Sequence, residues 1–208
     1  MTAKRARTAP ARRRLSPEDR RRQLLDAAVG AFARTGLART VHADVARRAG
    51  VAVPTVFHYF PSRPALLQAV LGELDERFIR LARAHHAADR PARECLRRHA
   101  LAFMAEVDDA PDHVRLWLEW STSVREDTWP SYLDFQERLV AIVAATVERG
   151  IARGEIAPGL SAAETARLVV GCAHMVVMTR LAPPAGVDVE AYLARVLAAV
   201  VPAPTRKA

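Results

Sequence analysis

Two short stretches with helical spacing, joined through Ala49-Gly50-Val51, constrain the fold of this chain more than any other feature. The first spans about His42–Ala49 and the second about Val53–Tyr59. Gly50 permits the positive φ of a sharp turn. Pro54 is compatible with the second helix because it lies in the first turn, where its missing amide would have no partner. Two short helices connected in this way form a helix-turn-helix.

The second of these helices divides its side chains by polarity. At 100° per residue, one arc carries Pro54, Thr55, His58 and Tyr59, and the opposite arc carries Val53, Val56, Phe57 and Phe60. We expect the four apolar side chains to anchor the helix and the polar arc to be exposed. Hydrogen-bonding groups on a firmly held helix are what recognition in the DNA major groove requires. The alternative is an ordinary amphipathic helix at the protein surface.

Charge is distributed unevenly along the chain. The 208 residues carry a net charge of +8, from 31 Lys and Arg against 23 Asp and Glu. Residues 1–22 carry +7, residues 23–67 carry +3 and the remainder carries −2. Such a basic segment favours a polyanionic partner, either nucleic acid or an anionic membrane surface. A solvated disordered tail would explain the first 22 residues, but not the +3 of the following segment.

The rest of the sequence predicts helices throughout, so the expected fold class is all-α. Only 6% of the residues are aromatic, and frequent Ala, Leu, Val and Arg favour helix over sheet. Ser16 and Pro17 begin a first helix that Gly36 ends, and Ser62 caps a long fourth helix. Further helices are expected at about 91–108, 111–125, 129–154, 161–181 and 188–201.

Several classes of protein and site are not expected. The two cysteines, Cys95 and Cys172, cannot form a disulfide framework, which favours a reducing, cytoplasmic compartment. No uncharged stretch reaches the roughly 18 residues of a membrane span, and no apolar segment of signal-peptide length begins the chain. Cys95 and His99 lie four residues apart near His85-His86, but zinc takes four ligands, and we expect a core Cys and surface His. With no catalytic motif either, we expect no enzyme, cofactor or metal.

The block from Leu25 to Leu67 resembles the DNA-binding domain of the TetR family of bacterial transcriptional regulators. The matching features are Asp44-Val45-Ala46, the turn at Ala49-Gly50-Val51, Thr55 with Phe57-His58-Tyr59-Phe60, Arg63 and Leu66-Leu67. Within that family, the segments RRRLSP, FARTGL, HADVA, TVFHYFPSR and RLWLEWSTSVREDTWP are similar to the quorum-sensing master regulators of the HapR/SmcR type. The last segment, residues 115–130, lies in the variable C-terminal half, so its match is the more specific one.

The resemblance implies a homodimer with nine helices per subunit that binds a pseudo-palindromic operator in double-stranded DNA. The last two helices of each subunit would form a four-helix bundle with their partners. Residues 161–181 and 188–201 are apolar on more of their circumference than one subunit can cover, which supports dimerisation independently. The domains expected are a disordered basic arm at 1–15, a helix-turn-helix domain at 16–67, a regulatory and dimerisation domain at 68–202 and a tail at 203–208.

Candidate DNA contacts follow from the motif and its flanks. Pro54, Thr55, His58 and Tyr59 are assigned to the major groove and to phosphates. Thr40, His42 and Arg63 flank the motif at helix N-termini, where phosphates are favoured. The resemblance suggests that Arg12, Arg13 and Arg14 enter the minor groove. The sequence departs from the family at Ala52, Pro54 and His58, where a small polar cap, Gly or Ala, and Asn respectively are usual.

The C-terminal half is expected to enclose a pocket for a small hydrophobic ligand, at positions suggested partly by the related regulators. The candidate lining residues are Phe78, Leu81, Trp117, Trp120, Gln136, Cys172, Met175 and Met178. An apolar stripe at helical spacing is also what an ordinary core requires, and this alternative remains open for each residue. Non-specific binding to an anionic surface, whether nucleic acid or membrane, is the alternative function.

Overall fold

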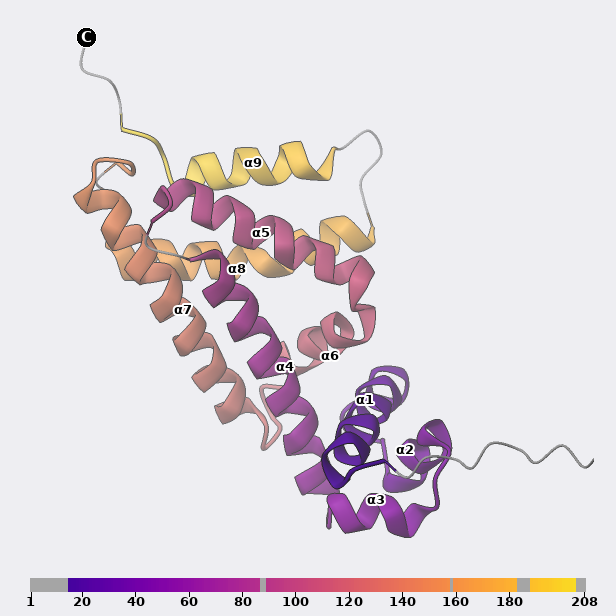
Figure 1. Cartoon of the computed structure of the whole chain (residues 1–208). Helices are drawn as coiled ribbons and strands as arrows, with labels where there is room; N and C mark the ends of the chain where they lie inside the picture. The colour runs from indigo at the N-terminus through magenta and orange to yellow at the C-terminus, as the bar shows by residue number, and fades with distance from the viewer. Residues whose placement is uncertain (1–14, 87–88, 158, 183–187, 205–208) are drawn as a thin grey trace, which may run out of the picture.

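The computed structural model describes residues 15–86, 89–157, 159–182 and 188–204. Within these ranges the chain forms nine helices and no strand, which confirms the expected all-α fold (Figure 1). The helices are α1 Pro17–Thr35, α2 His42–Ala49, α3 Val53–Tyr59, α4 Arg63–His85, α5 Ala92–Asp109, α6 Pro111–Ser121, α7 Trp129–Ala152, α8 Ala162–Leu181 and α9 Val189–Val200. None of these helices is long and apolar enough to cross a membrane.

Helices α1 and α4 begin, and α2 ends, at the caps expected from the sequence. The Ser16 hydroxyl accepts a hydrogen bond from the amide of Asp19 at 3.0 Å, and the Ser62 hydroxyl accepts one from Ala65 at 3.2 Å. Gly50, which follows α2, adopts a left-handed conformation with φ of +65°. The two serine hydroxyls pair with backbone amides that have no partner within the first turn of a helix. Gly50 adopts a left-handed conformation that ends a helix.

Helix α6 ends at Ser121, four residues before the expected end at residue 125. The hydroxyls of Thr122 and Ser123 donate to the carbonyls of Leu118 and Trp120, at 3.2 Å and 2.7 Å. Serine and threonine side chains that take over the last carbonyls of a helix compete with its continuation. The three consecutive hydroxyl residues after Trp120 therefore end this helix.

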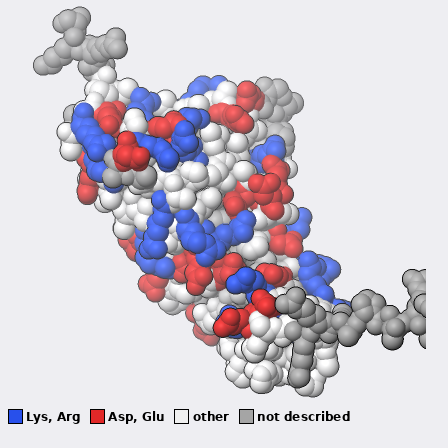
Figure 2. Space-filling view, in the orientation of Figure 1, with Lys and Arg blue, Asp and Glu red and all other residues white. Residues whose placement is uncertain are grey.

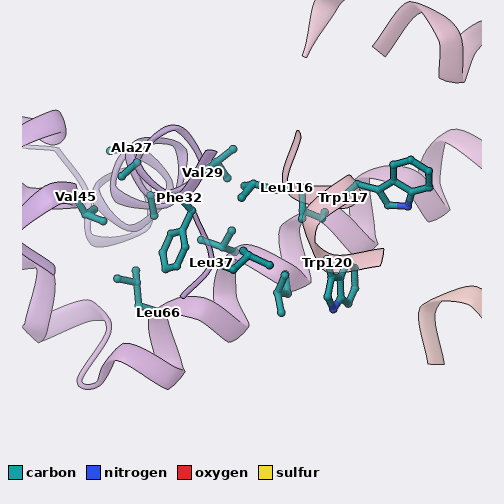
Figure 3. Packing of buried hydrophobic residues seen from close by; sticks show 14 of the residues in the cluster. Ala27, Val29, Phe32, Leu37, Val45, Leu66, Leu116, Trp117 and Trp120 are labelled. Carbon is teal, nitrogen blue, oxygen red and sulfur yellow. The ribbon is translucent and has the colours of Figure 1, made fainter. Parts of the chain in front are cut away.

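One hydrophobic core joins the two ends of the molecule. We call α1–α3 the head and α4–α9 the body. Phe32 and Val45 of the head belong to the same buried cluster as Leu116, Trp117 and Trp120 of the body. Figure 3 shows Phe32 and Leu37 on one side and Leu116 on the other, within one continuous packing of side chains. Helix α6 packs directly on α1, and it is therefore the element of the body that contacts the head most closely.

The far end of the body leaves part of its apolar surface exposed. In Figure 1, α8 and α9 lie at the end of the molecule opposite α3. Leu168, Met178 and Leu181 of α8 are each about half exposed, and Leu193 is the only residue of α9 that is fully buried. A single subunit thus does not cover these two helices.

Candidate DNA interface and ligand cavity

Helix α3 is fixed to α2 by one hydrogen bond and one ring contact. The Nε2 atom of His42, at the start of α2, lies 2.8 Å from the carbonyl oxygen of Phe60. The His42 ring stacks on Phe57 with 3.9 Å between centroids and an angle of 2° between planes. Val56 and Phe60 are buried in the core beneath the helix. These contacts hold α3 in one orientation.

The loop that leads into α2 is held from inside the protein. The buried hydroxyl of Thr40 donates to the carbonyl of Gly36 at 2.8 Å. The guanidinium of Arg63 donates to the carbonyl of Thr40 at 3.1 Å and also to that of Leu37. Thr40 and His42 were predicted among the DNA contacts at helix N-termini, where phosphates are favoured. Both side chains are buried and bonded internally, so they support the loop and α3 from within, and a phosphate contact at these positions stays a prediction.

The outer side of α3 presents the polar residues that the helical arc predicted. Pro54 and His58 are exposed, and Thr55 and Tyr59 are half-buried. Together these four residues line an open surface groove with Leu15, Pro17 and Arg20 from the start of α1. Arg20 is a groove residue that the sequence reasoning missed, although it was counted in the basic segment. Arg12, Arg13 and Arg14 lie outside the described residues.

The apolar side of α3 is less buried than expected. Only Val56 and Phe60 are buried in the core, while Val53 is 36% and Phe57 46% exposed. Val53 lies at the first turn of the helix, and Phe57 lies at the edge of the arc, where His42 covers one face of its ring. The prediction that all four residues anchor the helix is therefore wrong for Val53, while Phe57 anchors it through its stacking on His42 without being buried.

Charged side chains are not concentrated on the described surface of α3. In Figure 2, the lower end of the molecule, where Figure 1 places α3, is largely without Lys, Arg, Asp or Glu on the visible side. The body instead shows interspersed basic and acidic side chains. In the described part of the head, the basic side chains nearest to α3 come from other elements, among them Arg20 of α1 in the shared groove.

A cavity of about 60 Å³ lies in the body between α4, α5, α6, α7, α8 and α9. Four of the eight predicted lining residues contribute to it: Phe78, Trp117, Gln136 and Cys172. The remaining wall is mostly aliphatic, and it is completed by Leu96, His99, Ala100, Phe103, Phe135, Leu139, Val143, Val169, Val170, Ala173, Val176, Leu193, Val196 and Leu197. No described residue of the wall carries a formal charge at neutral pH if His99 is neutral.

The other four predicted residues lie outside the cavity wall. Trp120 is 1% exposed and donates its indole N–H to the carbonyl of Thr128 at 3.1 Å, so it belongs to the core. Met178 is exposed at the surface, and the sulfur of Met175 accepts a hydrogen bond from the Tyr192 hydroxyl at 3.2 Å. Leu81 is half-buried against the edge of the core. The assignment of these four residues to the cavity is therefore corrected. Helical spacing predicts on which face of a helix a residue lies, but not which other element packs against that face.

His99 of the cavity wall forms a pair of neutral histidines with His86. His99 Nδ1 lies 3.0 Å from His86 Nε2, and His86 Nδ1 lies 2.8 Å from the Thr146 hydroxyl. Burial lowers the pKa of His99 to about 3, with a smaller contribution from the neighbouring His86. Burial, followed by the positive charge of Arg149, lowers the pKa of His86 to about 4. His99 is thus an internal group of the cavity, and the expectation of a surface histidine is wrong.

Helix α6 contacts both the cavity and the head. Trp117 forms part of the cavity wall, while Glu119 Oε1, two residues later, accepts a hydrogen bond from the amide of Leu37 at 2.8 Å. At the other end of the helix, Asp112 lies 3.7 Å from the guanidinium of Arg48 on α2. Helix α6 therefore links the cavity wall to the loop and helix that precede α3.

Known proteins match this chain in both sequence and fold. The description "Bacterial regulatory proteins, tetR family" applies to the family whose sequence model matches residues 24–70. The HTH-type transcriptional regulator LuxR of Vibrio harveyi is 36% identical over 154 residues, 74% of this chain and 73% of that protein. The regulator BetI of Burkholderia mallei is 33% identical over 152 residues, 70% and 77% of the two chains. The structure of FadR from Bacillus subtilis in complex with stearoyl-CoA superimposes with a TM-score of 0.73 at 22% identity, covering 88% of this chain and 99% of that one.

Proposed function

The chain belongs to the TetR family of DNA-binding transcriptional regulators, and we propose that it acts as a homodimer on a pseudo-palindromic operator. The observation that carries this proposal is the fixed orientation of α3. His42 and Phe60 hold the helix from within, while Pro54, Thr55 and His58 face outward. A recognition helix needs this combination of rigid support and an accessible face to align with base edges.

Within that interface, we assign different tasks to the groups around α3. His58 is the exposed hydrogen-bonding side chain of the helix and is assigned to base edges. Thr55 and Tyr59, which are half-buried, are assigned to phosphates, together with Arg20 across the groove. Arg63 supports the loop before α2 through the carbonyls of Leu37 and Thr40. The arm residues Arg12, Arg13 and Arg14 are assigned to the minor groove on the basis of their sequence.

The proposed dimer forms through α8 and α9. Leu168 and Met178 are exposed on α8 in the single subunit, and most of α9 is not fully buried. Burying these apolar side chains against their symmetry mates is favourable in free energy. A two-fold arrangement of the subunits would present two copies of α3 to DNA, about 34–36 Å apart or a multiple of that spacing.

The cavity in the body supports a regulatory ligand that is small, uncharged and largely apolar. Its wall is aliphatic and aromatic, with polar groups from His99, Gln136 and Cys172. The volume of about 60 Å³ is below the roughly 300–1,000 Å³ of typical ligand pockets, so binding would require the helices to separate. The FadR structure, a protein of the same fold in complex with stearoyl-CoA, supports the capacity of such a fold to bind a ligand. Because Trp117 lies in the wall, such opening would displace α6 and change the position of the head.

Selection of bound sequences from random duplex DNA tests the operator proposal. We expect enrichment of a palindrome whose two half-sites are separated by about one helical turn or a multiple of it. A parallel measurement with vesicles of anionic phospholipid tests the alternative of non-specific anionic-surface binding. Tight vesicle binding, combined with no enrichment of any DNA sequence, would overturn the proposal in favour of that alternative.

A further inference from the structure

The recognition helix lacks the side chains that usually distinguish bases by paired hydrogen bonds. The sequence of α3 is VPTVFHY, which contains no Arg, Lys, Asn, Gln, Asp or Glu. Arg and Lys pair with guanine, Asn and Gln pair with adenine, and Asp and Glu accept from cytosine. Only Thr55, His58 and Tyr59 of α3 have hydrogen-bonding side chains, and two of these three are half-buried. Most of the sequence discrimination by this helix must therefore come from another kind of contact.

Three large apolar side chains are exposed where that contact would be made. Val41 is 46% exposed, Val53 36% and Phe57 46%. Val41 precedes His42, whose ring stacks on Phe57, and Phe57 lies one helical turn after Val53. The three residues thus lie just before α2 and on the exposed side of α3. We call Val41, Val53 and Phe57 the apolar rim.

Phe57 is the member of the apolar rim that is held in place. Its ring stacks nearly parallel to that of His42, and His42 is itself bonded to the carbonyl of Phe60. Isolated exposed apolar residues are common on protein surfaces. Exposed apolar residues on a recognition helix are different, because their desolvation on binding contributes to affinity. Val53 and Phe57 are exposed on α3 together with Pro54 and His58, which are proposed to face DNA, and this makes duplex DNA the occupant of the rim.

Only one base carries an apolar group in the major groove of unmodified DNA, and that is thymine with its C5 methyl. We propose that the apolar rim reads thymine methyl groups, and that each half-site of the operator is selected for thymine at one or two positions by Val53 and Phe57. This inference rests on the proposed operator binding and adds the chemistry of its specificity. It predicts discrimination against cytosine and uracil at the same positions, since both lack the methyl group.

The test replaces thymine by uracil, which removes the methyl and leaves the Watson–Crick pairing unchanged. Each thymine of one selected half-site is replaced in turn, and the dissociation constant is measured by fluorescence anisotropy at one fixed salt concentration. We expect a loss of about fourfold per methyl at one or two positions, the factor that corresponds to burying one methylene group. Introducing 5-methylcytosine at a cytosine-substituted position should recover part of the affinity.

Variants of the rim assign the effect to its residues. In Val53→Ala and Phe57→Ala, the difference between thymine and uracil duplexes should shrink at one position each. Because Phe57→Ala also removes the stacking on His42, Phe57→Leu and the thermal unfolding of each variant distinguish lost contact from lost fold. Val124→Ala serves as the control, since Val124 is 61% exposed in the loop between α6 and α7.

The outcomes separate the inference from the proposed function. Equal affinity for thymine and uracil duplexes at every position overturns the reading of methyl groups but leaves operator binding intact. A uracil effect that persists unchanged in folded rim variants assigns the methyl contact to another residue and overturns the role of the rim. Failure to select any operator removes the proposed function, and the inference with it.

Discussion

At the scale of single residues, His58 and His99 show how position decides what an imidazole does. His58 lies on the outer side of α3 with its ring edge against Tyr59, 5.0 Å between centroids. His99 lies in the cavity wall and pairs with His86. The exposed ring can exchange water for a base edge or a phosphate, whereas the internal ring must remain neutral because burial opposes its charge.

We predict that His58→Ala reduces operator preference while leaving non-specific binding nearly unchanged. Loss of one hydrogen bond to a base edge corresponds to about 1 kcal/mol, or about fivefold in the ratio of specific to non-specific affinity. Competition binding with random duplex DNA measures this ratio. Arg115→Ala, a change at an exposed residue of α6, should leave it unaltered. An equal loss on all sequences would remove His58 from base recognition.

The buried histidine pair predicts a loss of stability in mild acid. In the unfolded chain, both imidazoles bind protons below a pKa of about 6.5, but in the folded protein they remain neutral to about pH 4 for His86 and about pH 3 for His99. Between pH 6.5 and 4 the unfolded state therefore binds more protons, so the free energy of unfolding decreases as the pH falls.

Thermal unfolding between pH 7.5 and 4 tests this dependence. His99→Gln retains a hydrogen-bonding group beside His86 but removes one titrating ring, so its melting temperature should fall less steeply with decreasing pH. His58→Gln changes an exposed histidine of α3 outside the cavity wall, and it is the matched control. Identical slopes for wild type and His99→Gln would contradict the assignment.

At the scale of elements, the sequence predicts where a helix starts and ends better than it predicts which other helices pack against it. Ser16, Gly50 and Ser62 act through their own backbone or the next turn, so the sequence alone locates α1 to α4. The exposure of Phe57 depends on how far α2 reaches over α3, and no local pattern contains that information. Only four of the eight predicted residues line the cavity, for the same reason. The sequence indicates which face of each helix is apolar, but it does not indicate which other helix covers that face.

Close approach of α7 to the start of α5 gives a prediction at this scale. A Cβ added at Gly150 of α7 would lie 2.5 Å from Ile156 Cδ1 and 2.6 Å from Ala92 Cβ. Gly150→Ala should therefore lower the free energy of unfolding, because overpacking costs about 1–3 kcal/mol and exceeds the gain in helix propensity. Urea denaturation measures the change.

Gly72→Ala provides the opposite expectation on α4. Nothing lies within 4 Å of a Cβ added there, so this variant should gain about 0.5–1 kcal/mol from helix propensity alone. If the two alanine variants have the same sign, the packing described between α5 and α7 does not exist in solution.

At the scale of the whole molecule, the two ends have different tasks. The basic residues concentrate in the first third of the sequence, at the end that meets DNA, while the slightly acidic remainder forms the body. Charge and motif made this division predictable from the sequence. The packing of α6 on α1 was not predictable, because Leu37 and Leu116 are far apart in the chain. The segments FARTGL and RLWLEWSTSVREDTWP, which contain them, do not indicate that the two residues share one core.

The proposed dimer predicts that a charge on α8 separates the subunits. Met178→Glu places a carboxylate on the apolar surface of α8, at a residue that is 57% exposed in one subunit. Leu168→Glu does the same at a second exposed residue of α8. Sedimentation analysis at micromolar concentration should show dimers for the wild type and monomers for both variants. Val124→Glu introduces the same charge at an equally exposed valine and should remain dimeric. Dimeric Met178→Glu and Leu168→Glu proteins would place the interface elsewhere.

The continuous core between head and body has a consequence for how such regulators diversify. Phe32 and Leu116 are parts of one packed interior, so a head cannot be exchanged between relatives as an independent module. A recombinant that joins this head to a foreign body would lose the partners of Leu37 and Phe32 unless α6 came with it. Under the proposed function, new operator preferences would therefore be acquired most easily by substitutions on the outer side of α3, and new ligand preferences by substitutions in the cavity wall, with α1 and α6 kept as a matched pair.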